Sequence, residues 1–132
     1  MTVFGCGGNR DPLKRPKMAH IAEKLSDFVI VTTDNPRKED PYEIIQQILP
    51  GFQDKSRFIV ELDRRQAIQK AICRAQPGDI VLIAGKGHET YQIFSHQTID
   101  FDDRVVAKRV VVQALDSFSK AISKGVFPFW SW

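Results

Sequence analysis

Short continuous runs of hydrophobic residues alternate along the chain with segments in which hydrophobic residues recur every three or four positions. The continuous runs lie at 28–31, 58–60 and 80–83, and each is typical of a strand buried in a parallel sheet. The segments with helical spacing lie between these runs. This alternation predicts an α/β fold with a largely parallel sheet.

Capping residues predict where two of the helices begin. Asp40 can cap a helix that starts at Pro41, and Glu43 completes a pattern similar to a capping box. Asp63 with Gln66 marks the start of another helix in the same way. The predicted buried faces are Ile44, Ile45, Ile48 and Leu49 in the first helix and Ala67, Ile68, Ala71, Ile72 and Ala75 in the second.

Two further helices and a hairpin complete the predicted elements. A helix is expected over 16–25, and its apolar residues at helical spacing are Met18, Ile21, Ala22 and Leu25. Asp102 is expected to cap a long last helix that carries Val105, Val106, Val110 and Ala114. Strands over 91–94 and 98–101 are expected to form a hairpin that turns near Ser95 and His96.

One domain is expected over residues 1–118, because a chain of 132 residues can bury a single core. Residues 119–132 form an aromatic C-terminal tail, to which the sequence assigns no role. The chain opens almost within a strand, since Val3 and Phe4 run directly into a glycine-rich segment. We therefore expect that upstream sequence is missing.

Charge and composition exclude several classes of function. The net charge is +3, and the basic residues are dispersed among acidic ones, which argues against a nucleic-acid-binding surface. The group of basic residues that comes closest to such a surface is Arg10, Lys14, Arg15 and Lys17. We interpret this group as a local anion site. Every apolar run is too short to span a bilayer, so we expect no membrane contact. Cys6 and Cys73 are expected to be free thiols in a reducing cytoplasm.

Three polar loops follow predicted strands, at 7–11, 34–37 and 85–89. If the strands are parallel, all three loops emerge at the carboxyl edge of the sheet, where open α/β folds bind ligands. Taken singly, the loop at 7–11 is equally well explained as a turn with a surface arginine, and the loop at 34–37 is better explained as a turn with a solvated arginine. Their convergence at one edge is what favours a binding site.

The loop residues suit an amino acid as the ligand. Asp34 and Asn35 can stabilise a turn, and Pro36 fixes the backbone that leads to Arg37, whose guanidinium suits a carboxylate. The cations are expected to be Arg10 and Arg37. The groups expected to accept an ammonium are the Glu89 carboxylate and the Gly85 carbonyl. Two cations favour a ligand with more than one carboxylate.

Catalytic and metal-binding motifs are not found in this sequence. It contains no P-loop, no G-x-S-x-G motif and no convincing Cys–His pair. His88 and Glu89 have no third ligand at a suitable spacing, so we expect no metal site. A lone His88 is more often structural than catalytic. The domain is therefore interpreted as a binding domain without catalytic residues.

The order of these motifs resembles the C-terminal domain of the Mur ligase family, over about residues 3–112. The likeness rests on the segments Gly5–Asp11, Lys14–Met18, Thr33–Arg37, Ala84–Glu89, Tyr91–Ile93 and Asp100–Arg104. It implies a Rossmann-like domain with a mostly parallel six-stranded sheet and helices on both faces. In this family an Asp-Asn-Pro-Arg motif, here Asp34–Arg37, marks the ligases that select meso-diaminopimelate.

The resemblance implies an ATP-dependent peptide ligase that adds meso-diaminopimelate to UDP-MurNAc-L-Ala-D-Glu in peptidoglycan biosynthesis. Arg37 and Arg10 would bind the distal carboxylate that lysine lacks. Asp34, Asn35, Pro36, Gly85 and Glu89 would complete the diaminopimelate site. ATP, Mg²⁺ and the UDP-linked substrate would be bound by domains that are absent here, so we expect this chain to be inactive alone and to bind no cofactor. Two alternatives stay open: a stand-alone binding module for an acidic or zwitterionic metabolite, and the equivalent domain of a sibling Mur or folylpolyglutamate-type ligase.

Overall fold

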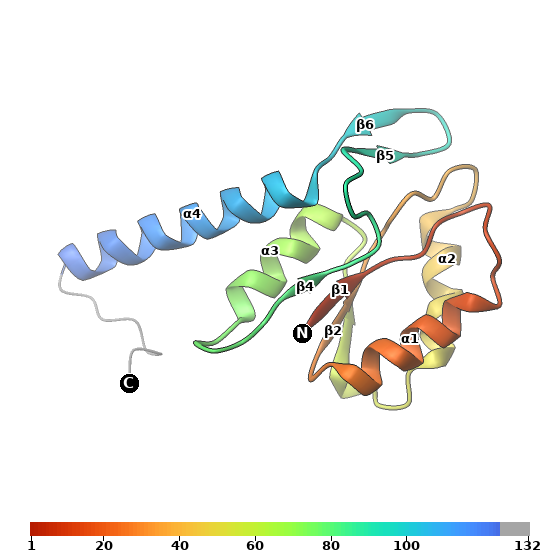
Figure 1. Ribbon diagram of the computed structural model, residues 1–132, viewed down its shortest axis with the longest axis horizontal. Coiled ribbons are helices and arrows are strands. Elements are labelled where there is room, and N and C mark those ends of the chain that lie inside the picture. Colours follow the sequence, from red (N-terminus) through yellow and green to blue (C-terminus); the bar gives the residue numbers. More distant parts are fainter. Residues whose placement is uncertain (125–132) are drawn as a thin grey trace.

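Four parallel strands form the centre of the computed structural model, which describes residues 1–124 (Figure 1). They are β1 (Thr2–Phe4), β2 (Val29–Val31), β3 (Phe58–Val60) and β4 (Leu82–Ile83). Their order is β3-β2-β1-β4, and all three pairings are parallel. The chain moves outward from β1 to β3 and then crosses back to β4. The switch point of this Rossmann-like order therefore lies at β1.

Three of the four α-helices of the described residues begin after an aspartate that caps them, whereas the first helix has no side-chain cap. The helices are α1 (Lys14–Leu25), α2 (Pro41–Ile48), α3 (Arg64–Arg74) and α4 (Asp103–Ser123), and short 3₁₀ turns occupy Leu49–Gly51 and Lys55–Arg57. The predicted caps are confirmed: the carboxylates of Asp40, Asp63 and Asp102 accept hydrogen bonds from backbone N–H groups of α2, α3 and α4.

The hydrophobic core has two parts, one on each face of the sheet. Val3 and Ile30 point to the side covered by α3 and α4. Phe4 and Val29 point to the side covered by α1 and α2, as the alternation along a strand requires. Figure 1 shows the two pairs of helices on opposite sides of the sheet. The prediction of an α/β fold with helices on both faces is confirmed.

The prediction of one six-stranded sheet is wrong for the described residues. β5 (Tyr91–Ile93) and β6 (Thr98–Asp100) form a separate antiparallel hairpin. The backbone N–H of Arg37 donates to the Ile93 carbonyl, so β5 meets the loop after β2 instead of extending the sheet beyond β4. β4 is also shorter than the strand predicted over 80–83, and Ile80, which lies outside β4, is 80% exposed.

The helix α1 begins two residues earlier than predicted and buries a different face. Its apolar residues Met18, Ile21 and Leu25 are 40%, 55% and 78% exposed. The buried row is instead Arg15, Ala19 and Glu23. Arg15 donates to the Glu39 and Gln47 side chains, and Glu23 accepts from the backbone N–H groups of Gln53 and Asp54. These polar contacts, which helical spacing does not report, determine which face of α1 is buried.

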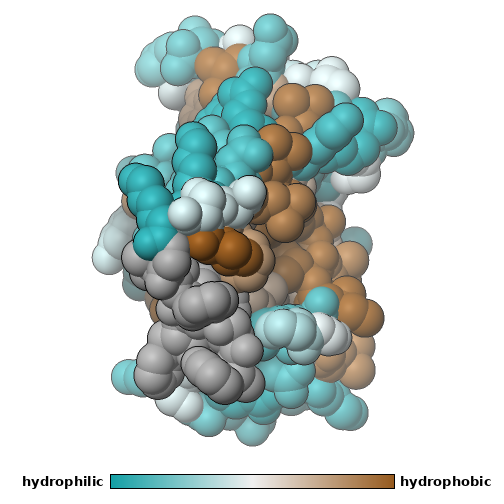
Figure 2. Space-filling view, turned by 90° about the vertical axis from the view of Figure 1, so that its left-hand side faces the viewer, coloured by the Kyte–Doolittle hydropathy of each residue, from teal (hydrophilic) through white to brown (hydrophobic). Residues whose placement is uncertain are grey.

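The last helix, α4, packs only through its first turns. Val106 and Val110 are buried as predicted, whereas Val105 and Ala114 are exposed. The helix continues to Ser123, across the predicted domain boundary at residue 118, which stays a prediction. Residues 125–132 of the predicted tail lie outside the described part. Figure 2, which views the molecule from the α4 end, shows a band of hydrophobic side chains on this face. Among residues 1–124, no helix is both long and apolar enough to cross a membrane.

Candidate functional site

The three polar loops meet at the carboxyl edge of the sheet, next to the switch point at β1. The Gly8 N–H donates to the Asn35 carbonyl at 2.8 Å, which joins the loops after β1 and β2. The Asn35 side-chain amide donates to Glu89 Oε2 at 2.9 Å, which joins the loops after β2 and β4. The structure therefore brings the predicted site residues together, while their binding roles stay predictions.

Close backbone packing fixes how the first two loops meet. A Cβ atom added to Gly8 would lie 1.8 Å from the Pro36 carbonyl oxygen, so only glycine fits at this position. Pro36 is itself fully buried. Arg37 follows with a φ of 54°, a left-handed conformation that is uncommon for a residue other than glycine. The buried Pro36 and the bond from the Arg37 N–H to Ile93 stabilise this turn.

Arg10 and Arg37 lie beside the same glycine. A Cβ atom added to Gly7 would be 2.9 Å from Arg37 Nη1 and 3.4 Å from Arg10 Cγ. Arg37 Nη1 donates to the Gly8 carbonyl at 2.9 Å, which orients the guanidinium. Its Nε and Nη2 atoms make no hydrogen bond with any residue in 1–124 and are free to bind a carboxylate. Arg10 is exposed.

The acidic side of the site is built around a buried lysine that the sequence analysis did not assign. Lys86 is 2% exposed, and its ammonium donates to Asn35 Oδ1 at 3.0 Å and to Glu89 Oε2 at 3.2 Å. It also lies 3.6 Å from Asp34 Oδ1, which is an ion pair without a hydrogen bond. Asp34 and Glu89 thus face each other across one cation.

Burial and neighbouring charges act in opposite directions on the two carboxyl groups. Burial raises the pKa of Asp34 above its ordinary value, although the charges of Lys86 and Arg64 oppose the rise. For Glu89, burial alone would raise the pKa. The hydrogen bonds from Asn35 and Lys86 together with the Lys86 charge outweigh it, so the net shift is downward. Glu89 is therefore the better stabilised of the two carboxylates.

Gly85 occupies the turn between β4 and the buried lysine. Its φ of 108° is a conformation that side chains other than hydrogen disfavour. A Cβ atom here would lie 3.7 Å from Asp34 Oδ2, so Gly85 lies against the carboxylate of the second loop. His88, in the same loop, is exposed and makes no hydrogen bond with the described residues. That His88 is not catalytic stays a prediction.

Arg64 stabilises the backbone of two site loops, and sequence reasoning did not predict this role. Its guanidinium makes a two-pronged ion pair with Asp103, through bonds of 2.8 and 2.7 Å, and is 1% exposed. It also donates to the carbonyls of Thr33 and Ala84, the residues just before Asp34 and Gly85. The sequence did contain a signal for Arg64. A positive charge in the first turn of a helix is unfavourable for the helix dipole, so an arginine at this position indicates a role in tertiary contacts.

The predicted anion cluster is corrected at Arg15. Its guanidinium is 2% exposed and donates to Glu39, to Gln47 and to the Gly7 carbonyl. Because these acceptors occupy its accessible donors, Arg15 supports the first loop and is not available for a solvent anion. Arg10, Lys14 and Lys17 remain exposed.

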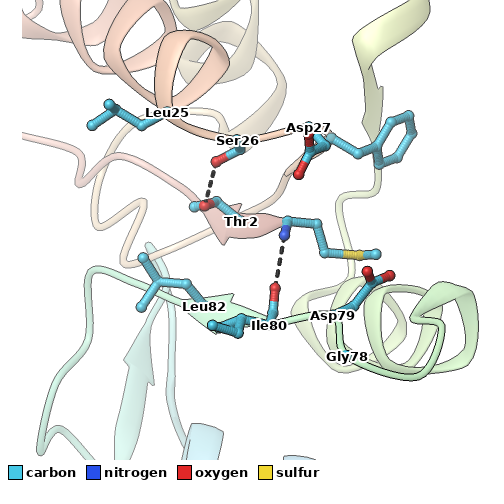
Figure 3. Close-up of a pocket in the computed structure, with 10 residues that line it drawn as sticks. Thr2, Leu25, Ser26, Asp27, Gly78, Asp79, Ile80 and Leu82 are labelled. Atoms are coloured by element: carbon cyan, nitrogen blue, oxygen red, sulfur yellow. Dashed lines mark hydrogen bonds between the residues drawn. The ribbon is translucent and has the colours of Figure 1, made fainter.

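A cavity of about 530 Å³ lies at the opposite, amino edge of the sheet (Figure 3). It is lined by residues 25–28 and 78–80 and by the start of β1. The hydroxyl groups of Thr2 and Ser26 hydrogen-bond each other across its wall at 2.7 Å. This cavity contains none of the predicted site residues. Within residues 1–124, no three His, Cys, Asp or Glu side chains are grouped so as to hold a metal ion.

Comparison with known proteins identifies the family. Residues 1–87 match the family described as "Mur ligase, glutamate ligase domain". The chain belongs to the Mur ligase family. Relatives named UDP-N-acetylmuramoyl-L-alanyl-D-glutamate–2,6-diaminopimelate ligase include one from Prochlorococcus marinus, 58% identical over 109 residues, and one from Chlamydia muridarum, 59% identical over 115 residues. These alignments cover 83% and 87% of the chain.

A solved structure of a Mur ligase has the same fold. It bears the same diaminopimelate ligase name, is 44% identical and covers 86% of this chain with a TM-score of 0.81. The chain spans only 23% of that structure, and 22% and 23% of the Prochlorococcus and Chlamydia relatives. The similarity therefore concerns one domain of much longer proteins.

Proposed function

We propose that this chain is the amino-acid-binding domain of an ATP-dependent ligase that adds meso-diaminopimelate to UDP-MurNAc-L-Ala-D-Glu. The observation that carries the proposal is the separation of charge at the carboxyl edge of the sheet. Arg37 has free guanidinium donors beside Gly7 and Arg10, whereas Glu89 and Asp34 lie around Lys86. An amino acid with a carboxylate and an ammonium at one end matches this arrangement.

The site supports discrimination against lysine. Lysine lacks the distal carboxylate, so its binding would leave the guanidinium donors of Arg37 without an acceptor. Sites with polar groups that the wrong ligand leaves unpaired can discriminate by a factor on the order of 10⁴. The names of the relatives described above favour diaminopimelate over the amino acids of sibling Mur or folylpolyglutamate-type ligases.

ATP, Mg²⁺ and the UDP-linked substrate belong to the rest of the ligase in this proposal. The described residues do not fit Mg²⁺, since they contain no suitable group of ligands, and the sequence contains no P-loop. The part played by this chain is therefore to bind and orient the incoming amine. We expect it to be inactive alone and to act in the cytoplasm, where UDP-linked precursors and ATP are found.

Isothermal titration calorimetry of the 132-residue chain tests this proposal. The expected result is saturable binding of meso-diaminopimelate and much weaker binding of L-lysine under the same conditions. Equal affinities for both amino acids would contradict the proposed role of Arg37 and Arg10.

A further inference from the structure

Lys86 occupies the centre of the acidic side of the site, although the sequence analysis gave it no role. Its side chain is completely buried, and its ammonium contacts three polar side chains, those of Asp34, Asn35 and Glu89. A buried ammonium is costly unless it is paired and hydrogen-bonded, and these contacts satisfy that requirement. Lys86 is thus an internal cation with a fixed position.

The hydrogen bonds of Lys86 determine how Asn35 and Glu89 are oriented. Asn35 Oδ1 accepts from Lys86 Nζ and from the Ile93 N–H, so the amide nitrogen must point the other way, toward Glu89. Glu89 Oε2 then accepts from both Asn35 and Lys86. Glu89 Oε1 accepts no hydrogen bond within residues 1–124, and the Glu89 side chain is 31% exposed. One oxygen of Glu89 is therefore presented outward.

The charges of this cluster add to a single negative charge. Asp34 and Glu89 contribute two negative charges when ionised, and Lys86 contributes one positive charge. Arg64 also faces Asp34, but Asp103 neutralises it in a buried ion pair. The charge of Arg37 also lowers the pKa of Glu89, but Arg37 makes no hydrogen bond to Glu89, and in the proposed complex its charge is matched by the carboxylate of the ligand. The remaining charge matches one ammonium group.

We propose that Lys86 is a positioning residue that holds the Asp34–Glu89 cluster at one net negative charge and orients Glu89 Oε1 to receive a single ammonium group. Lys86 does not contact the ligand itself and is not displaced by it. This inference rests on the proposed function, because it assumes that the ligand's ammonium binds at Glu89. It adds a residue that sets the charge of the site and therefore its selectivity for one amino group at this end of the ligand.

The cluster without Lys86 would behave differently as the pH changes. Two partly buried carboxylates that face each other without a cation between them cannot both ionise easily, so the pKa of one of them rises. At a pH below that raised pKa, one of the two carboxyl groups of the cluster is protonated, and the net charge equals that of the wild-type cluster. Glu89 is then protonated in part of the molecules and cannot accept the ammonium group in them. Ligand affinity should then fall as the pH falls. A lysine with a merely structural role would give a loss that does not depend on pH.

The test compares the wild-type chain with Lys86→Met by carbon-13 NMR titration of the carboxyl groups of Asp34 and Glu89. Methionine preserves the length of the side chain and removes its charge. The expected result is a rise of about one pH unit or more in the apparent pKa of the pair. Lys70→Met is the control, because Lys70 pairs with Glu61 on the surface, and it should leave both titrations unchanged. Unchanged titrations in Lys86→Met would overturn the proposal.

Calorimetry with meso-diaminopimelate at pH 5 and pH 8 provides the second part of the test. The ratio of the affinity at pH 8 to that at pH 5 should be about twofold or more larger in Lys86→Met than in the wild type, because a carboxyl pKa raised by about one unit or more comes to lie near pH 5 or above. An equal ratio would contradict the proposal. Absence of binding by the wild-type chain would contradict the proposed function, while the carboxyl titrations would still decide the role of Lys86.

A measurement on the wild type keeps the inference testable if Lys86→Met does not fold. The protons on Lys86 Nζ should exchange slowly enough to be seen by nitrogen-15 NMR, because the ammonium is buried and hydrogen-bonded. Their signals should persist when the chain is saturated with meso-diaminopimelate. Loss of these signals on saturation would show that the ligand displaces Lys86, and the proposal would be wrong.

Discussion

Arg37 Nη1 donates a hydrogen bond of 2.9 Å to the Gly8 carbonyl, across 29 positions of sequence. This contact joins the second polar loop to the first and leaves Nε and Nη2 of Arg37 without a hydrogen bond to any residue in 1–124. The Asp-Asn-Pro-Arg turn is therefore both a structural junction and the carrier of the proposed carboxylate-binding group. Substitutions around it should separate these two roles.

Gly8→Ala should destabilise the chain by about 3 kcal/mol or more, because the new methyl group would overlap the Pro36 carbonyl, which belongs to the backbone and cannot move freely. Urea denaturation followed by circular dichroism measures this change. Gly78→Ala is the matched control, since its φ of 89° brings strain but no atom lies within 4 Å of the new Cβ. A loss in Gly8→Ala no greater than in this control would mean that the two loops do not pack as described.

Arg64→Met should cost about 3–5 kcal/mol of unfolding free energy, because it leaves Asp103 buried without its partner. Arg104→Ala is the control in the same denaturation experiment. It removes the ion pair with Asp102, which has the same length but whose arginine is 65% exposed. A small effect is expected there, since exposed pairs are screened by water. Similar losses in both variants would contradict the supporting role of Arg64.

Arg37→Ala, placed in an intact ligase that contains this domain, should weaken the use of meso-diaminopimelate and leave the affinity for ATP little changed. One charge-assisted hydrogen bond contributes about 1.5–3 kcal/mol, so the KM for the amino acid should rise by roughly ten- to a hundredfold. Steady-state kinetics with each substrate varied in turn measures this. Arg109→Ala, an exposed site on α4, is the control. An unaltered dependence of rate on diaminopimelate concentration would refute the assignment of Arg37.

The two cysteines should differ sharply in reactivity. Burial is the main cause that raises the pKa of the Cys6 thiol to about 11, whereas Cys73 is exposed. At pH 8 only about one Cys6 in a thousand would be a thiolate, the reactive form. Ellman's reagent should therefore titrate one thiol in the native chain and two after unfolding. Rapid reaction of two thiols in the native chain would show that Cys6 is not buried.

The sequence predicted best those features that depend on neighbouring residues. The starts of α2 and α3 follow from Asp40 with Pro41 and from Asp63, because a helix cap is a local interaction. The convergence of the three loops also followed, since parallel strands place their carboxyl ends at one edge. The loop chemistry supplied most of the candidate residues, and the family resemblance then indicated which amino acid they would bind.

Features that depend on distant contacts were predicted less well. The buried face of α1 is determined by Arg15 and Glu23, whose partners lie 24 to 32 positions away. The hairpin does not join the four-stranded sheet, and the Ile93 carbonyl of β5 instead accepts a hydrogen bond from the Arg37 N–H. Lys86 gave no signal of burial, since a lysine between two glycines is ordinarily solvated and its three partners come from two different loops. Such residues become recognisable only when the loops are seen together.

The most direct test of the account is a two-dimensional NMR titration of the nitrogen-15-labelled chain with meso-diaminopimelate, and with L-lysine in parallel. Saturable shifts are expected for Arg10, for Asp34–Arg37 and for Gly85–Glu89 with meso-diaminopimelate, and little response is expected in these loops with L-lysine. Residues around the cavity at the amino edge, such as Ser26 and Asp79, should not shift. Equal responses to both amino acids, or shifts confined to the amino edge, would contradict the account.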